Sequence, residues 1–91
     1  MKIIIVDDDK LVCTALKTIV EAGGIEVAAV GNCGREAVAL YEKIHPDILL
    51  MDIRMKDLTG LEAAEQILAG DKEARILFLT TFADDEYIVS A

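Results

Sequence analysis

Aspartates follow two apolar segments of this 91-residue chain, at the point where each segment ends. Asp7, Asp8 and Asp9 come directly after "IIIV", and Asp52 follows "ILLM". If these segments are neighbouring strands, each pair of carboxylates repels by about 3 kcal/mol at about 5 Å and an effective dielectric constant of about 20. A divalent cation offsets that repulsion, and Mg²⁺ accepts a site with few protein oxygens and several waters. The pattern predicts a magnesium site on Asp8, Asp52 and a loop carbonyl, with Asp7 in the same cluster.

A third apolar segment, "ILFL", ends on the hydroxyl residues Thr80 and Thr81. A simpler interpretation of the three aspartates at 7–9 is that they end a strand and begin a helix, with Asp9 as the N-cap. That interpretation accounts neither for the acid that ends the second segment nor for the hydroxyls that end the third.

The elements that must position these residues alternate between strand and helix. Apolar and β-branched runs predict strands over 2–6, 25–31, 47–52 and 75–81. Apolar residues at helical spacing predict helices over 10–23, 34–44 and 61–70, and a further helix from residue 83. Such alternation favours a doubly wound parallel α/β sheet with helices on both faces, in which ligands bind at the carboxyl ends of the strands.

Several residues set the limits and faces of the helices. The pair Gly23 and Gly24 ends the first helix, and Pro46 prevents the second from continuing. In the third helix the spacing places an apolar face inward, formed by Leu61, Ala64, Ile67 and Leu68. The one histidine, His45, is expected in a turn.

Composition excludes several classes of function. Seventeen acidic and nine basic residues give a net charge of −8, which argues against direct binding of nucleic acid or of an anionic membrane. No apolar run approaches the roughly 18 residues of a spanning helix, and the start is too short and too acidic for a signal peptide, so we expect a cytoplasmic protein. Cys13 and Cys33 form no metal-binding or redox pair and are expected as small buried residues or near-surface thiols.

Four segments, "IIIVDDDKLV", "HPDILLMDIRM", the Gly of "LTGLEA" and "ILFLTTFADDEYI", resemble the receiver domain of two-component response regulators. They are most similar to the CheY-like receivers of the NarL type, which precede helix-turn-helix DNA-binding domains. The resemblance covers residues 1–91 in order and implies one flavodoxin-like domain with strand order 2-1-3-4-5. On this basis the chain is a receiver incomplete at its C-terminus, with four strands in order 2-1-3-4.

The resemblance also implies residue roles and a partner. Asp52 is the nucleophile that takes a phosphoryl group from the phosphohistidine of a sensor histidine kinase. Asp7 and Asp8 hold Mg²⁺ together with Asp52 and the backbone carbonyl of Arg54. Two further positions complete the implied site, the switch hydroxyl Thr80 and the small residue after it, Thr81.

The sequence departs from the family pattern in its charge. The family lysine of the fifth strand has no counterpart among the 91 residues, and Lys56 stands where the family commonly has proline. One hypothesis is that Lys10 or Lys56 partly supplies the missing charge; a solvated loop lysine is the simpler interpretation. Without a fifth strand, the segment 75–81 becomes an apolar edge, which predicts self-association through that edge or exchange of elements between protomers.

Two alternative functions stay open. The first is a receiver-like interaction module that is not productively phosphorylated, because the family lysine is absent. The second is a phosphatase of the haloacid dehalogenase type, since Asp7 and Asp9 form a D-x-D motif after an apolar strand. The phosphatase needs later acidic and lysine motifs and a cap, for which 91 residues leave no room. Beyond the self-catalysed gain and loss of a phosphoryl group, no enzyme activity is expected.

Overall fold

The computed structural model describes residues 1–55 and 57–79. In chain order its elements are β1 (Lys2–Val6), α1 (Lys10–Ala22), β2 (Glu26–Gly31), α2 (Gly34–Ile44), β3 (Ile48–Asp52), α3 (Gly60–Gly70) and β4 (Ile76–Leu79). Every boundary that falls on described residues lies within one residue of its prediction. Residues 80–81 of the predicted last strand, and the helix predicted from residue 83, lie outside the described residues.

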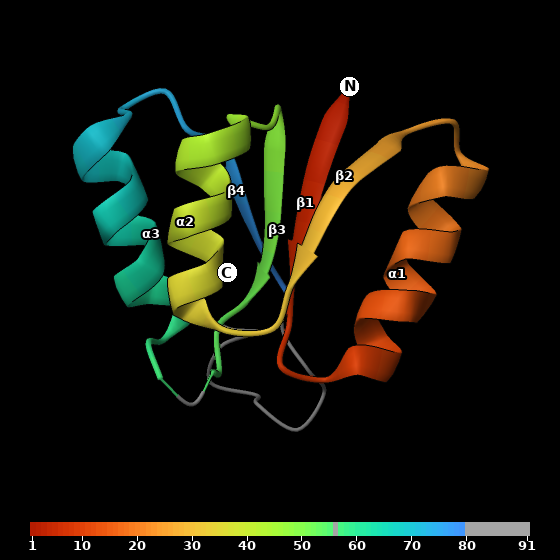
Figure 1. Ribbon diagram of the computed structural model, residues 1–91, viewed down its shortest axis with the longest axis horizontal. Helices are drawn as coiled ribbons and strands as arrows, with labels where there is room; N and C mark the ends of the chain where they lie inside the picture. Colours follow the sequence, from red (N-terminus) through yellow and green to blue (C-terminus); the bar gives the residue numbers. More distant parts are fainter. Residues whose placement is uncertain (56, 80–91) are drawn as a thin grey trace.

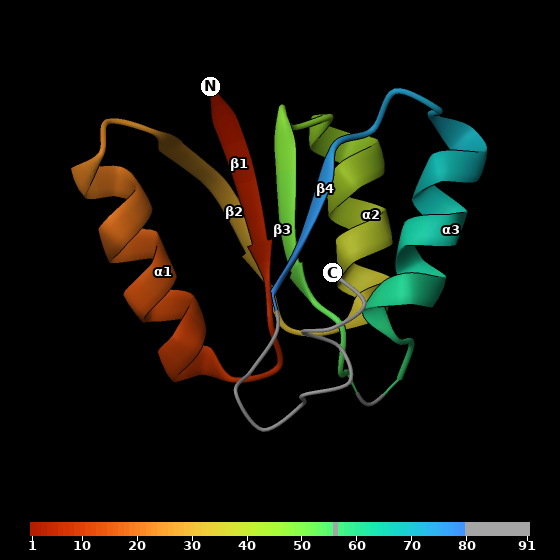
Figure 2. The same cartoon turned by 180° about the vertical axis from the view of Figure 1, so that it is seen from behind.

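The four described strands form one parallel sheet in the order β2-β1-β3-β4. The predicted doubly wound, flavodoxin-like order is therefore confirmed. The ribbon places α1 on one side of the sheet and α2 with α3 on the other (Figure 1), and the reverse view keeps this division (Figure 2). All strands run in the same direction, so their carboxyl ends lie at one end of the molecule.

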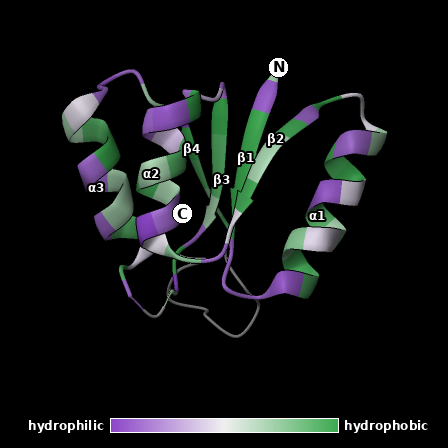
Figure 3. Ribbon diagram, in the orientation of Figure 1, coloured by the Kyte–Doolittle hydropathy of each residue, from purple (hydrophilic) through white to green (hydrophobic). Residues whose placement is uncertain are grey.

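The strands carry mostly hydrophobic residues (Figure 3), and their buried side chains form two apolar layers, one on each face of the sheet. On one face, Ile4, Val6, Leu49 and Met51 pack with buried side chains of α2 and α3. A smaller buried set lies between the other face and α1. It consists of Ile3, Ile5 and Leu50 of the strands and Cys13 of α1. The sheet is thus apolar on both faces, as its continuous apolar runs predict.

The buried face of α3 differs from the prediction. Leu61 and Leu68 are 49% and 41% exposed, so their inward placement was wrong. The buried stripe is Gly60, Ala63, Ala64 and Ile67, which follows the i, i+3, i+4, i+7 spacing of a single helix face. The small residues let α3 lie close to its neighbours, whereas leucines would hold it away.

Left-handed backbone occurs at two helix ends. Gly24 has a φ of 84°, a conformation that glycine adopts without steric cost, just after α1. His45 has a φ of 50° and its N–H donates to the Tyr41 carbonyl at 2.8 Å, so it ends α2 in the turn that the sequence predicts. Within the described part of the chain, none of the helices has the length and apolar character needed to cross a membrane.

Candidate functional site

Three carboxylates meet at the carboxyl ends of β1 and β3. Val6 pairs with Met51 across these neighbouring strands. The residues that follow them in the chain, Asp7 and Asp52, therefore lie side by side. One carboxylate oxygen from each of Asp7, Asp8 and Asp52 lies within 4.8 Å of the others. Among the described residues this is the only such group of three metal-ligating side chains.

Burial differs among the three acids. Asp7 and Asp52 are 5% and 7% exposed, whereas Asp8 is open to solvent. Burial, followed by repulsion from Asp52, Asp8 and Asp9, raises the pKa of Asp7 from 3.8 to about 6, although the Asp9 N–H opposes the shift. The ionised form of Asp7 is therefore destabilised in the folded protein, as expected where burial and nearby like charges act together.

The backbone of Asp7 is held by groups from two other elements. Its N–H donates to the Gly31 carbonyl at 3.1 Å. Its carbonyl accepts from Asn32 Nδ2 at 3.1 Å and from the thiol of buried Cys13 at 3.4 Å. Sequence reasoning missed the role of Asn32, because no spacing in the chain connects it with a residue 25 positions away.

The third aspartate of the cluster has a separate task. Asp9 Oδ1 accepts from the N–H groups of Leu11 and Val12 at 2.9 and 3.4 Å and caps α1. Its own N–H donates to Asp7 Oδ1 at 2.9 Å. The simpler interpretation of the cluster was therefore correct for Asp9, while Asp7 and Asp8 face Asp52.

The loop after Asp52 is closed tightly at its base. The Gly60 N–H donates to the Ile53 carbonyl at 2.8 Å. A Cβ on Gly60 would collide with the Asp52 carbonyl oxygen and lie 2.9 Å from Ile53 Cα. Glycine is therefore required here by the close approach of α3 to the end of β3.

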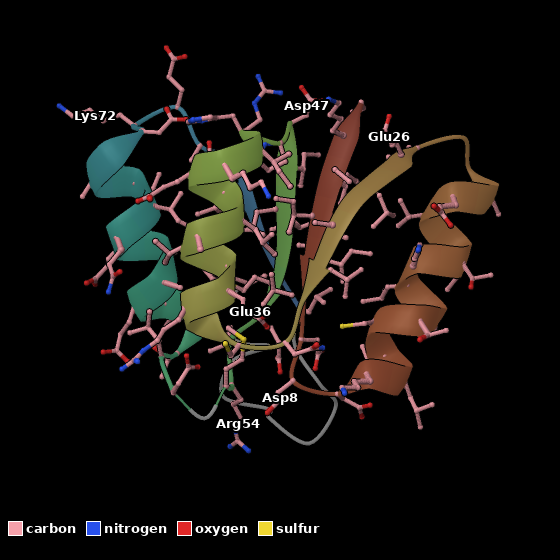
Figure 4. All side chains as sticks on the ribbon, viewed as in Figure 1. Asp8, Glu26, Glu36, Asp47, Arg54 and Lys72 are labelled. Carbon is pink, nitrogen blue, oxygen red and sulfur yellow. The ribbon has the colours of Figure 1, made fainter. Side chains whose placement is uncertain are left out.

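The structure describes only some of the other predicted site residues, and these lie in different places. Arg54 is exposed in the loop after β3, and its side chain points away from the sheet at the same end as Asp8 (Figure 4). Lys10 lines a hollow between α1 and β2 with Asn32, not the hollow beside the three acids. The predictions for Lys56, Thr80 and Thr81 fall outside the described residues.

The donor set of the acid cluster fits Mg²⁺. A hollow of about 370 Å³ adjoins it, lined by Asp7, Asp8, Asp9, Val12, Leu16, Asp52 and Leu79. The three converging donors are all carboxylate oxygens, the ligands that hard divalent cations prefer, and the exposed side at Asp8 leaves room for water. Arg54, whose carbonyl is the predicted further ligand, follows two residues after Asp52 in the chain.

A larger hollow, of about 550 Å³, lies at the opposite end of the sheet, lined in part by Tyr41, His45 and Asp71. Its buried polar group is already paired, since the Tyr41 hydroxyl donates to Asp71 Oδ2 at 2.7 Å. Its acids and histidine do not converge as the carboxyl-end acids do. We therefore place the candidate site at the acids and not at the larger hollow.

Comparisons with known proteins show the family to which the chain is similar. Residues 3–91 match the family described as the response regulator receiver domain. The chemotaxis protein CheY of Listeria monocytogenes is 37% identical over 91 residues, which cover 100% of this chain and 76% of that protein. The response regulator protein VraR of Staphylococcus aureus is 34% identical over 92 residues, which cover 100% of this chain and 44% of VraR.

Solved structures give the same result. A chain of the CheX-CheY-BeF₃-Mg²⁺ complex from Borrelia burgdorferi has a TM-score of 0.89 at 25% identity, over 98% of this chain and 68% of that chain. Family match, sequence identity and fold all point the same way: the chain belongs to the response regulator receiver domains.

Proposed function

We propose that this receiver domain accepts a phosphoryl group on Asp52 from the phosphohistidine of a sensor histidine kinase. The observation that carries the proposal is the convergence of Asp52 with Asp7 and Asp8 within 4.8 Å at the carboxyl end of the sheet. Ligands of open parallel sheets bind at that end. The CheX-CheY-BeF₃-Mg²⁺ complex from Borrelia burgdorferi, which has a chain similar to this one, adds support from a relative.

In the proposed reaction, a carboxylate oxygen of Asp52 attacks phosphorus. The new oxygen–phosphorus bond forms as the phosphorus–nitrogen bond to the donor imidazole breaks, and the bonding electrons leave with that nitrogen. Asp7, Asp8, Asp52 and the Arg54 carbonyl would hold Mg²⁺. When bound, the metal neutralises and orients the phosphoryl oxygens. Asp7 must be ionised for this role, and the Asp9 N–H at 2.9 Å favours its ionised form.

Two further roles rest on the family resemblance. Thr80 is the proposed hydroxyl that turns to the phosphoryl oxygen on activation, and Thr81 is the small residue beside it. Acetyl phosphate is a suitable donor for a test without a kinase, because its phosphoryl group can be transferred directly to a carboxylate, with acetate as the leaving group.

The test is labelling of the 91-residue protein by acetyl phosphate with Mg²⁺, followed by mass spectrometry. We expect labelling at Asp52, loss of labelling in Asp52→Asn, and unchanged labelling in Asp47→Asn. Asp47 is a matched control because it lies at the opposite end of the sheet, where it accepts from the Lys2 N–H at 2.6 Å. A wild-type protein that binds Mg²⁺ but takes no label would favour the interaction module instead.

We also propose self-association through β4. Among the described strands β4 pairs only with β3, and its Leu77 is 58% exposed. An apolar strand at a sheet edge favours pairing with another chain. Light scattering at micromolar concentration should show a dimer, and Leu77→Lys should shift it toward monomer. A monomeric wild-type protein would contradict this proposal.

A further inference from the structure

The first turn of α2 is capped differently from the first turns of α1 and α3. Asp9 caps α1 with its own side chain, and Thr59 forms a capping box with Glu62 at the start of α3. Cys33, the N-cap residue of α2, makes no side-chain hydrogen bond to its helix. The first N–H groups of a helix have no partner within the helix, so those of α2 need an acceptor from elsewhere.

Asp57 provides that acceptor from the loop between β3 and α3. Its Oδ1 accepts from the Gly34 N–H at 3.0 Å, and its Oδ2 accepts from the Arg35 N–H at 3.2 Å. Although desolvation acts in the other direction, N–H groups of Leu58, Gly34 and Arg35 lower the pKa of Asp57 to about 2. The side chain is therefore an ionised, two-pronged acceptor at the positive end of the helix dipole.

The same loop also touches α2 through its backbone. Gly34 is buried, and a Cβ added to it would collide with the Leu58 carbonyl oxygen and lie 2.7 Å from Leu58 Cβ. The segment after β3 passes beneath the start of α2 in the ribbon (Figure 1). Loop and helix are thus joined by both a close packing contact and a pair of charge-assisted hydrogen bonds.

This loop begins directly after Asp52 and contains Arg54, so it connects the candidate site with α2. The hydrogen bond from the Gly60 N–H to the Ile53 carbonyl fixes the base of the loop. Asp57 fixes the part of the loop beyond Arg54 to a second element. Groups that hold a metal ligand in place usually affect affinity, because an unfixed ligand must be ordered when the metal binds.

We propose that Asp57 is a positioning residue, which ties the β3–α3 loop to the first turn of α2 and thereby holds the Arg54 carbonyl in place relative to the carboxylates of Asp8 and Asp52. The inference rests on the proposed function, since it concerns the same metal and phosphoryl site. Asp57 itself contacts neither metal nor phosphoryl group in this proposal. Its effect is on the affinity of the site.

The first test compares Mg²⁺ binding by the 91-residue wild-type protein and by Asp57→Ala, measured from amide chemical shifts in an NMR titration. We expect the dissociation constant of Asp57→Ala to rise about tenfold, the lower end of the range for residues that orient metal ligands. Asp57→Asn keeps one acceptor oxygen and should lie between the two. Hydrogen exchange of the Gly34 and Arg35 amides should become faster in Asp57→Ala.

Tyr41→Phe is the matched control. It also removes a hydrogen bond between α2 and a distant segment, the bond to Asp71, but at the other end of the helix. We expect it to lower the thermal midpoint while leaving Mg²⁺ affinity within twofold of wild type. A tenfold loss of affinity in this control would mean that Asp57 acts only through general stability, which would overturn the proposal.

The double variant Cys33→Ser, Asp57→Ala separates helix capping from loop positioning. Cys33 has extended N-cap geometry, so a serine there can supply a local cap. We expect the double variant to recover the thermal midpoint but to keep weak Mg²⁺ binding. Recovery of both quantities, or wild-type affinity in Asp57→Ala itself, would show that Asp57 is only a helix cap.

The same samples distinguish this inference from the proposed function. If the wild-type protein binds Mg²⁺ but acetyl phosphate does not label it, phosphoryl acceptance is wrong and the Mg²⁺ comparison still decides the role of Asp57. If the wild-type protein is labelled and Asp57→Ala shows unchanged Mg²⁺ affinity, only the positioning role is wrong. Absence of Mg²⁺ binding by the wild-type protein would overturn both.

Discussion

The two ends of the sheet use aspartate in opposite ways. At the carboxyl end, Asp7, Asp8 and Asp52 converge within 4.8 Å, and the pKa of Asp7 is raised to about 6. At the amino end, Asp71 accepts from the Tyr41 hydroxyl at 2.7 Å, and this bond is the main cause of its lowered pKa. The acid cluster at the carboxyl end opposes the ionised form of Asp7, whereas the Tyr41 hydroxyl at the amino end favours that of Asp71.

This difference indicates that the acids at the carboxyl end serve a requirement other than stability. Two acids at the amino end accept from complementary donors, Asp71 from the Tyr41 hydroxyl and Asp47 from the Lys2 N–H at 2.6 Å. The carboxyl end instead keeps a cluster of acids in which burial and like charge raise the pKa of Asp7. Sites that violate local stability in this way are commonly functional. Three sets of variants would break or sharpen this comparison.

The largest effect is expected from a methyl group added to a glycine at the carboxyl end. In Gly60→Ala the new Cβ meets backbone atoms of Asp52 and Ile53 that have no room to move, so we expect a loss of about 3 kcal/mol in the free energy of unfolding. Gly70→Ala is the matched control at the other end of α3. It has no atom within 4 Å of the added Cβ and should gain about 0.5–1 kcal/mol.

Chemical denaturation of both variants measures these values. Equal effects at the two glycines would show that the close contact of α3 with the end of β3 is absent in solution. Labelling of Gly60→Ala should also be slower, because the collision displaces the segment that follows Asp52.

Neutralising a buried acid at the carboxyl end should stabilise the metal-free protein. The folded-state pKa of Asp7 is about 6 against an ordinary 3.8, so the wild-type protein loses stability as the pH rises from 3.8 to about 6. Asp7→Asn avoids this loss and should be more stable by about 2 kcal/mol at pH 7, with little difference below pH 3.8.

Thermal unfolding across this pH range, without and with Mg²⁺, checks the prediction. Added Mg²⁺ should stabilise the wild-type protein more than Asp7→Asn, because the variant lacks one ligand. Asp47→Asn at the amino end should show no gain at pH 7. Destabilisation by Asp7→Asn in the absence of metal would contradict the view that this cluster costs stability.

A smaller effect is expected from Tyr41→Phe at the amino end. Tyr41 is 4% exposed and its hydroxyl bonds to Asp71, so its removal should cost about 1–1.5 kcal/mol at pH 7. Burial, followed by the Asp71 bond, raises the pKa of Tyr41 to about 12. The wild-type protein should therefore lose stability between pH 10 and about 12, and its advantage over Tyr41→Phe should shrink there.

Denaturant unfolding at pH 7 and at pH 11 tests both parts. If the advantage of the wild-type protein stays constant between these two pH values, the buried bond between α2 and Asp71 does not exist in solution. If Tyr41→Phe does not lower the free energy of unfolding at pH 7, the hydrogen bond at the amino end does not stabilise the protein, which contradicts the comparison.

Much of the fold and of the site was predictable because each part has a local signal. β-branched runs and helical spacing predict all seven described elements, because the side that an element buries fixes the spacing of its apolar residues along the sequence. The aspartates that end two strands predict the acid cluster, because the carboxyl ends of parallel strands must lie together. The inward placement of Leu61 and Leu68 failed because spacing alone does not show which of two apolar stripes meets a neighbour.

The sequence by itself determined the alternation of strands and helices, the end of the sheet at which the acids lie, and the local cap at Asp9. These features depend on residues a few positions apart. Only the tertiary structure decided that Asn32 holds Asp7 and that Asp57 caps α2 from 23 positions away. Such contacts depend on how strands and helices pack, and no local pattern in the chain records which distant groups that packing brings within hydrogen-bond distance.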